Sequence, residues 1–382
     1  MPASPPPRTG QRLTIKDRPL EFSFWPLQRT SRRYGIGARI FATDPWTIVR
    51  REIESEFPAG LRGTGTALIE QAEDYFTASE SGVKAAKPLL LYYCFMNFGK
   101  AFALHRKVTN SVDNAQHGLG AKVRSPRTGN EVIDAYLNAF RSPSRRGQLQ
   151  NFDLMLEALT GGKIPVRGRS YDLSKLISQV VPGHRLWVPA ERKTERFISL
   201  DDIQFFVNRD TKQIWLRLFV FADHLKRVKL THKVFLDSTR LKNKFQNVKC
   251  SSKKNDRRLL CFEQIAPHSY TGRPSDEIPA LIETVKELLW QTILASRPYR
   301  KYYVYAAPSN EHLQVLPQIM SIYAITYYLG SIVRYRPQDF DHMLEGKFGP
   351  FVEAFLNDQP NQFLYLMTSE FVNKEVARAA IT

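Results

Sequence analysis

His117 is the residue whose type and surroundings most directly suggest acid–base chemistry. It lies in a short polar segment between Gln116 and Gly118, after an apolar stretch that should form a buried helix. An imidazole in this place could act as a general base or contact a phosphate group. The alternative is a structural role, in which His117 caps the end of that helix or bonds a neighbouring carbonyl. Gly118 and Gly120 would then supply the turn.

Arg334 and Arg336 form a second candidate site. They flank Tyr335 directly after an apolar segment. Two neighbouring guanidiniums suit bidentate contacts with phosphate, so the pair is a candidate anion-binding site. Cations at the C-terminal end of a helix are also favoured by the helix dipole. The alternative is therefore dipole matching and an ion pair with Asp339 or Asp341.

The third candidate is a dense run of positive charge between residues 226 and 258, here called the basic run. Its twelve Lys or Arg against two Asp give a net +10, more than half of the formal +18 of the 382-residue chain. The cationic side chains of the basic run are Lys226, Arg227, Lys229, Lys233, Arg240, Lys242, Lys244, Lys249, Lys253, Lys254, Arg257 and Arg258. We predict that they bind nucleic acid, DNA or RNA, by neutralising its phosphates. Trp215, Phe235 and Phe245 are available for stacking on bases.

Other partners suit the same charge. An acidic protein could meet the basic face of a non-catalytic adaptor, and an anionic membrane surface is a further candidate. Alternatively, the cationic residues form a solvated loop that binds no partner, especially over residues 249–258. The sequence leaves the oligomeric state open.

Several classes of chemistry lack their motifs. The chain has no GxxxxGK[ST], HExxH or GxSxG sequence, and the Gly-x-Gly pairs at Gly35 and Gly63 stand alone. Three cysteines lie far apart without a CxxC pair, which argues against disulfides and structural zinc. We therefore predict no cofactor and no metal. No run of eighteen apolar residues predicts a transmembrane helix, and Met1–Gly10 lacks a secretory apolar core, so a cytoplasmic location is expected.

The periodicity predicts an α+β fold, with helical units at both ends packed together and a strand-rich basic unit between them. The predicted ranges are an extended lead-in at 1–43, a helical unit at 44–185, a strand-rich unit at 186–270 and a helical unit at 271–382. One predicted helix begins at Asp44. The other predicted helices are Gly65–Phe76, Lys84–Arg106, Leu149–Leu159, Asp172–Val180, Ile278–Ala295 and Glu311–Arg334. Predicted strands are Arg196–Asn208, Gln213–Ala222, Lys233–Leu236 and Leu259–Ile265. The helices at 84–106 and 311–334 are so apolar that they should pack against each other.

Two pairs of segments resemble the YaaC-like family of bacterial proteins. They are Pro88–Ala101 (PLLLYYCFMNFGKA) with Ala115–Leu119 (AQHGL), and Leu329–Pro337 (LGSIVRYRP) with Phe363–Leu366 (FLYL). Because these segments bracket most of the chain, the resemblance extends to the whole architecture. The biochemical role of the family is poorly defined. The resemblance also implies that the protein acts within a bacterial defence or stress system.

A tyrosine-rich helix ending in Lys-Ala, followed by a loop with His117-Gly118, is also similar to the HEPN superfamily. Many HEPN proteins are metal-independent ribonucleases, in which an Arg and a His four to six residues apart act together on the RNA phosphate. His117 has no Arg at that spacing. The similarity therefore implies a catalytic centre at His117 or at the pair Arg336 and His342, although Pro337 interrupts the spacing of that pair. Metal-independent RNA cleavage is the alternative function, and whether the chain is an enzyme stays open.

Overall fold

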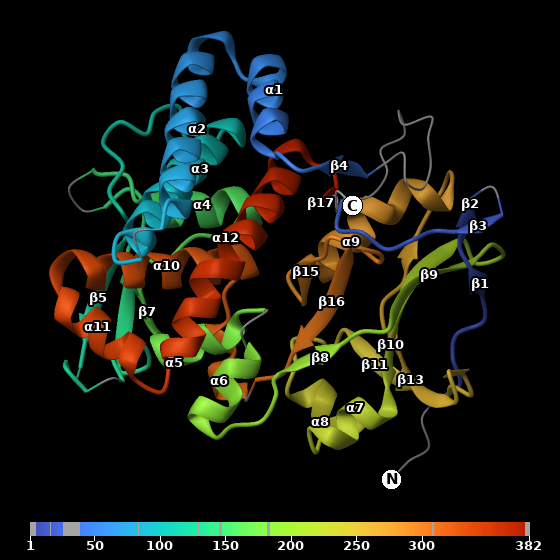
Figure 1. Ribbon diagram of the computed structural model, residues 1–382. Coiled ribbons are helices and arrows are strands. Elements are labelled where there is room, and N and C mark those ends of the chain that lie inside the picture. Colours follow the sequence, from blue (N-terminus) through green and yellow to red (C-terminus); the bar gives the residue numbers. More distant parts are fainter. Residues whose placement is uncertain are drawn as a thin grey trace. The chain divides into compact units, whose positions relative to one another are not determined.

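In the computed structural model (Figure 1), the described residues are 5–15, 17–25, 39–82, 84–124, 126–128, 130–144, 147–181, 184–307 and 309–378. Their contacts divide the chain into two compact units, each assembled from segments that are distant in the sequence. Unit 1 comprises residues 1–42, 194–313 and 373–382, and unit 2 comprises residues 43–193 and 314–372. The predicted α+β fold class is confirmed. The two units cut across the four consecutive ranges that the periodicity predicted.

Unit 2 consists mainly of helices. They are α1 (Trp46–Glu56), α2 (Ala59–Glu80), α3 (Lys87–His105), α4 (Asn151–Thr160), α5 (Leu173–Leu176), η2 (Ile177–Gln179), α6 (His184–Glu191), α10 (Gln318–Tyr335), α11 (Pro337–Glu345) and α12 (Gly349–Val372). The start of α1 follows the predicted signal, because the Asp44 carboxylate accepts hydrogen bonds from the Trp46 backbone N–H and the Thr47 hydroxyl.

The two most apolar helices of unit 2, α3 and α10, pack against each other, as predicted. Gly330 lets α10 approach α3 closely. A Cβ atom built on Gly330 would lie 3.2 Å from the Pro88 carbonyl oxygen and 3.3 Å from Cβ of Tyr92. On another side of α3, Phe95 stacks on Phe363 of α12 with ring centroids 3.7 Å apart. Helix α3 is therefore the centre of the unit 2 core, with α2, α10 and α12 around it (Figure 1).

A three-stranded antiparallel sheet of unit 2 was not predicted. It has the order β5 (Leu119–Val123), β6 (Ala135–Ala139), β7 (Arg169–Asp172). The predicted helix over Asp172–Val180 is shorter than expected and divided into α5 and η2. The carboxylate of Asp172 caps α5 by accepting from the Ser174 backbone N–H. Strand β7 therefore ends at the residue that starts the helix.

Unit 1 contains most of the strands. They are β1 (Gln11–Arg12), β2 (Thr14–Ile15), β3 (Arg18–Pro19), β4 (Ile40–Ala42), β8 (Phe197–Ser199), β9 (Asp202–Asn208), β10 (Gln213–Phe221), β11 (Phe245–Val248), β12 (Lys253–Lys254), β13 (Arg257–Gln264), β14 (His268–Ser269), β15 (Leu289–Ile293), β16 (Arg300–Tyr305) and β17 (Val376–Arg378). Its helices are α7 (Ala222–Arg227), α8 (His232–Asp237), η3 (Pro274–Glu277), α9 (Ile278–Lys286) and η4 (Ser309–Gln314), of which only the last residue of η4 falls in unit 2.

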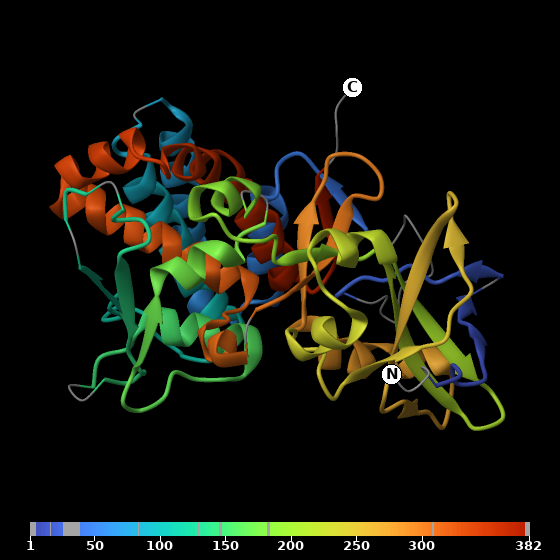
Figure 2. The ribbon, with the colours of Figure 1, turned by 90° about the horizontal axis from the view of Figure 1, so that it is seen from below.

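Among the described residues, the largest sheet of unit 1 has seven strands in the order β1-β9-β10-β13-β11, with β12 paired to β13 and β14 paired to β10. Its longer strands, yellow-green to gold, lie next to one another in Figure 2. Strand β9 alternates strictly, so that Ile203, Phe205 and Val207 are buried on one face. Helix α8 covers part of that face, where Phe235 packs on Phe262 of β13 with ring centroids 4.8 Å apart. The opposite face carries the more polar side chains of β9.

Two predicted elements of unit 1 were wrong. Lys233–Leu236 was predicted as a strand but lies in helix α8, which Thr231 caps by accepting from the Val234 backbone N–H. Ile278–Ala295 was predicted as one helix, but α9 ends at Lys286 and Leu289–Ile293 forms β15. Every residue of β15 is buried, so its sequence has no alternation to separate it from the helix before it.

A buried charge cluster joins three distant segments of unit 1. The carboxylate of Glu375 accepts from Nε of Arg39 at 2.6 Å and lies 3.4 Å from the Arg300 guanidinium. Next to it, β4 and β17 pair in parallel. Strand β4, which directly precedes unit 2 in the sequence, is thus joined within unit 1 to the last described strand. In neither unit is any helix within the described ranges long and apolar enough to cross a membrane.

Candidate functional site

The basic run is displayed on the surface of unit 1. Eleven of its twelve cationic residues are exposed, and Arg240 is partly buried. Four cations have acidic partners within unit 1: Arg240 pairs with Glu287, Lys242 with Asp237, Lys254 with Asp201 and Arg257 with Asp223. The other eight form no ion pair with any described residue. About two thirds of the charge is therefore available to an anionic partner.

A pocket of about 510 Å³ lies on the more polar face of the seven-stranded sheet, and we call it the sheet pocket. Lys249, Lys253 and Lys254 of the basic run line one part of it, and Phe206, Arg217 and Phe219 of strands β9 and β10 line another. Two carboxylates also line the sheet pocket. Asp201 is paired with Lys254, while Asp202 accepts from Gln204 and lies 3.7 Å from Arg12. Their charges are thus already matched by cations.

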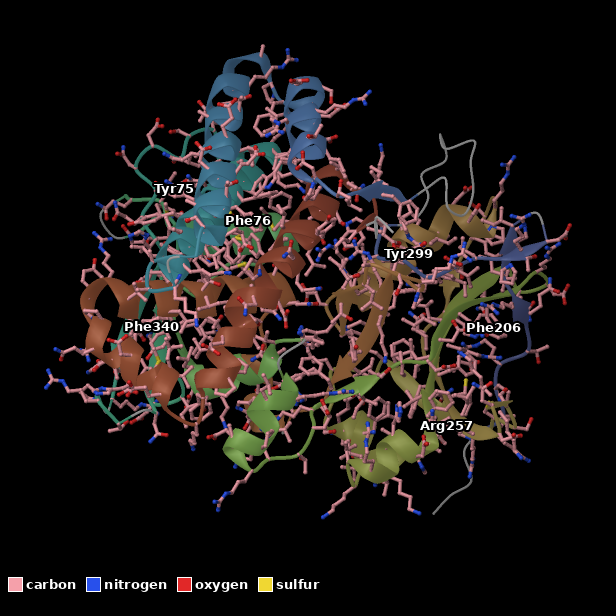
Figure 3. All side chains as sticks on the ribbon, in the orientation of Figure 1. Tyr75, Phe76, Phe206, Arg257, Tyr299 and Phe340 are labelled. Carbon is pink, nitrogen blue, oxygen red and sulfur yellow. The ribbon has the colours of Figure 1, made fainter. Side chains whose placement is uncertain are left out.

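Aromatic rings and guanidiniums are stacked on this side of the sheet. The guanidinium carbon of Arg217 lies 3.8 Å from the ring centroid of Phe206, and that of Arg257 lies 3.8 Å from the ring centroid of Phe221. Figure 3 labels Phe206 and Arg257. Both phenylalanine rings are partly exposed. They are the aromatic surfaces that lie beside the cations.

The three aromatic residues predicted to stack on bases are in the core instead. Trp215 and Phe235 are 0% exposed and Phe245 is 2% exposed, so the prediction of a stacking role was wrong. Trp215 is on the same sheet face as Phe206 but lies under the lead-in, where Arg8 covers its ring. The alternation of β9 could have identified Phe206, because it falls in step with Asp202 and Gln204 rather than with the buried residues.

A second pocket of about 450 Å³ in unit 1 is lined by Arg240, Lys242 and Lys244 together with Thr239, Leu288 and His312. Its cations belong to the basic run, but two of them are the ones paired with Glu287 and Asp237. The net charge at this pocket is therefore lower than the sequence suggests.

In unit 2, His117 lies against the end of a buried tyrosine network. Its Nδ1 atom is 2.5 Å from the hydroxyl of Tyr92 in α3. The predicted turn is present, since Gly118 has a φ of +81°. His117 also has a structural role, but through its backbone: its carbonyl accepts a hydrogen bond from the Phe152 N–H in the first turn of α4. The imidazole bonds a tyrosine and not a carbonyl.

The electrostatic surroundings of His117 are positive. Burial and the charges of Arg334 and Lys100 lower the pKa of His117, so the imidazole is neutral near pH 7. Burial and the neighbouring Tyr323 raise the pKa of Tyr92, so its phenol stays protonated. The contact between His117 and Tyr92 is therefore a bond between two neutral groups.

The two arginines of the predicted anion site have different partners. Arg334 donates to the Tyr93 hydroxyl at 3.3 Å, on the His117 side of the unit, whereas Arg336 pairs with Asp339 at 3.5 Å. Arg336 ends α10 and His342 lies on exposed surface near the end of α11. No hydrogen bond or ion pair joins Arg336 to His342 in the described part of unit 2. Catalysis by that pair stays a prediction.

No group of three or more His, Cys, Asp or Glu among the described residues could hold a metal ion. A family model of YaaC-like proteins matches residues 38–371. The chain belongs to the YaaC-like family. The matched range includes the basic run and His117, so both candidate sites lie within the YaaC-like part of the chain. Neither the comparison with curated proteins nor the comparison with solved structures found a match.

Proposed function

We propose that this YaaC-like chain binds single-stranded nucleic acid at the sheet pocket of unit 1. The observation that carries the proposal is the presence of Lys249, Lys253 and Lys254 around a pocket that also contains the partly exposed ring of Phe206. Cations that follow the backbone and aromatic rings that stack on bases are the two parts of single-strand recognition.

The aromatic lining favours a single strand over a duplex. Bases inside a duplex are stacked on one another and cannot lie flat on a ring at the surface of a sheet. Phe206 and Phe219 come from neighbouring antiparallel strands, so a base in the pocket would contact the sheet while its phosphates meet the lysines. An acidic protein partner would use the lysines but not the rings, which is why nucleic acid is the better occupant.

The test is binding of a labelled single strand of about 12 nucleotides, as DNA and as RNA, measured by fluorescence anisotropy at low salt. The double variant Lys249→Glu/Lys253→Glu should bind at least about tenfold more weakly than the wild type. The matched control is Lys226→Glu/Lys229→Glu, which reverses the same number of exposed charges in the basic run outside the pocket. It should lose no more than about threefold.

Phe206→Ala separates stacking from charge, because it should weaken binding by about tenfold without changing the salt dependence. If the wild type binds neither strand, the proposal is wrong. If the two double variants lose the same affinity, the strand is attracted by the overall positive charge and the pocket has no specific role. An excess of unlabelled duplex should compete poorly, and a duplex that competes as well as the single strand would contradict single-strand recognition.

A further inference from the structure

His117 belongs to a cluster of side chains in unit 2 that is separate from the sheet pocket. Tyr92 bonds Nδ1 of His117 at 2.5 Å, and the adjacent Tyr93 accepts from Arg334 at 3.3 Å. The rings of Tyr92 and Tyr93 lie 5.6 Å apart. Lys100 follows Tyr93 by two helical turns on α3, which places it on the same side of that helix. The cluster therefore draws on α3, α10 and the loop before β5.

The backbone holds His117 firmly in this position. The residue before it donates to the Leu149 carbonyl at 2.8 Å, and the His117 carbonyl accepts from the Phe152 N–H at 3.2 Å. A Cβ atom on Gly118 would lie 2.9 Å from the Phe152 nitrogen, and the φ of +81° is itself unfavourable for other residues. Only glycine lets the chain pass α4 at this distance and present the imidazole to α3.

A buried polar network fixes Tyr92, the side chain that bonds Nδ1 of His117. Asn151 is fully buried and donates to the Tyr323 hydroxyl at 2.9 Å, and Tyr323 packs against Tyr92 with ring centroids 5.8 Å apart. Such networks in a core allow few arrangements of their members. Nδ1 of His117 is thus occupied by Tyr92. Nε2 has no hydrogen-bond partner among the described residues, so it is the ring atom that can meet a ligand.

The charged groups around His117 are two cations, Lys100 from α3 and Arg334 from α10. The other titratable groups that face it are Tyr92 of α3 and Tyr327 of α10, and burial raises the pKa of both phenols. Tyr93 lies beside Tyr92. Asp113 acts on Lys100 and is not among the groups that shift the pKa of His117. Asp113 offsets part of the charge of Lys100, whereas Arg334 has no ion pair with any described residue, so the cluster keeps a net positive charge. This excess of positive charge is what an anion would neutralise.

We propose that this cluster binds a phosphoryl group, with Arg334 and Lys100 holding its charge and Nε2 of His117 exchanging a proton with one of its oxygens. A phosphate monoester or inorganic phosphate suits the cluster better than a carboxylate. It carries up to two negative charges for two cations, and the second ionisation of a monoester lies near pH 6, close to that of histidine. Bidentate contact with a planar guanidinium also favours phosphate oxygens.

Binding is linked to proton uptake. In the free protein the cations and burial keep His117 neutral. A bound anion cancels the repulsion from Arg334 and Lys100, so the pKa of His117 rises when the ligand binds. Affinity should therefore increase as the pH falls from 8 towards 6. The same linkage makes His117 a direct reporter of occupancy.

The test uses the full chain with isotope-labelled histidine and follows the His117 imidazole by NMR during titration with inorganic phosphate and, separately, with adenosine 5′-monophosphate. We expect the imidazole signals of His117 to shift and to reach saturation below tens of millimolar ligand, and we expect the pKa of His117 to be raised in the complex. Arg334→Gln and Lys100→Gln should each weaken binding by about tenfold. Tyr92→Phe should shift the balance of the His117 tautomers, which a loss of packing alone would not do.

Arg336→Gln is the matched control, because Arg336 is exposed, two residues from Arg334 and paired with Asp339 instead. It should bind phosphate as the wild type does. The proposal is overturned if His117 does not respond to either ligand, or if Arg336→Gln and Arg334→Gln lose the same affinity. Tighter binding of the nucleotide assigns the site to phosphate esters, whereas equal binding of the two assigns it to free phosphate.

Discussion

The guanidinium of Arg217 stacks on the ring of Phe206 while it pairs with the carboxylate of Glu263 at 2.8 Å. Glu263 is 1% exposed and also accepts from the Arg8 backbone N–H and the Trp215 indole N–H. One buried carboxylate therefore connects β10, β13 and the lead-in beneath the sheet pocket. The orientation of Phe206 depends on this carboxylate through Arg217.

Replacing Glu263 should destabilise unit 1 strongly. Glu263→Ala leaves the Arg217 guanidinium without its buried partner, so we expect the free energy of unfolding to fall by about 3–5 kcal/mol. Arg12→Ala breaks the exposed contact with Asp202 and should cost less than about 1 kcal/mol. Urea denaturation followed by circular dichroism measures both. Similar small losses in the two variants would show that the carboxylate does not organise the sheet.

Two glycines in helices should respond in opposite directions to the same substitution. At Gly330 a side chain has to push α10 away from the backbone of α3, so Gly330→Leu should lower the free energy of unfolding by about 1–3 kcal/mol or more. At Gly63 in α2 an added Cβ meets nothing within 4 Å, and Gly63→Leu should raise it by about 0.5–1 kcal/mol. Thermal unfolding of both variants tests the signs. Destabilisation by Gly63→Leu would contradict the packing described for α2.

The salt dependence of nucleic-acid binding should report the lysines of the sheet pocket. Each phosphate neutralised on a single strand contributes about −0.7 to the slope of log K against log salt concentration. Lys249 and Lys253, the two pocket lysines without an ion pair among the described residues, therefore predict a slope of about −1.4 or steeper, and Lys253→Gln should make it shallower by about 0.7. Lys84→Gln in unit 2 is the control and should leave the slope unchanged. Anisotropy titrations between about 50 and 200 mM salt give these slopes.

His105 in unit 2 packs against two aromatic rings. Its ring centroid lies 5.4 Å from that of Phe57 and 4.5 Å from that of Phe371. Burial is the main reason that the pKa of His105 is lowered, and the charges of Arg106 and Lys107 act in the same direction. Glu56 and a hydrogen bond of the imidazole to the Phe371 backbone oppose the shift without cancelling it.

This lowered pKa predicts a loss of stability in mild acid. The unfolded chain binds a proton at His105 near pH 6.5, while the folded chain does so only at a lower pH. The stability contributed by neutral His105 is thus present above pH 6.5 and declines as the pH falls from there towards the folded pKa. The unfolding free energy of His105→Phe should depend less on pH between 7 and 5 than that of the wild type. His342→Gln, on exposed surface, should keep the wild-type dependence.

The central helices could be predicted from the sequence because their signals are strong and local. Asp44-Pro45 marks the start of α1, and the apolar lengths of α3 and α10 require large packing partners. Shorter elements were harder. Helix α8 contains Val234 and Phe235, whose side chains favour a strand. Only the capping hydroxyl of Thr231 indicates a helix. Strand β15 follows α9 closely, and all of its residues are buried, so it lacks the alternation that would have separated it from the helix.

The charge of the candidate nucleic-acid interface could be predicted, but its aromatic part could not. A count of lysines and arginines identifies the basic run, since exposure is the usual state of these residues. Whether a ring is exposed depends on distant segments, as when the lead-in covers Trp215 and leaves Phe206 at the pocket. For the same reason His117 and Arg334 were separate candidates in the sequence, more than two hundred residues apart. Packing of α10 on α3 brings them into one electrostatic environment.

The division of unit 2 into two segments has a consequence for synthesis on the ribosome. Helix α3 emerges with residues 43–193, but its partner α10 follows only after the 120 residues of 194–313 have been made. At about 5–20 residues per second, this interval lasts roughly 6–24 s. During that time the apolar side of α3 that α10 will cover is open to the solvent. The nascent chain is thus exposed to aggregation at this stage, and shielding by a chaperone should increase the yield of native protein.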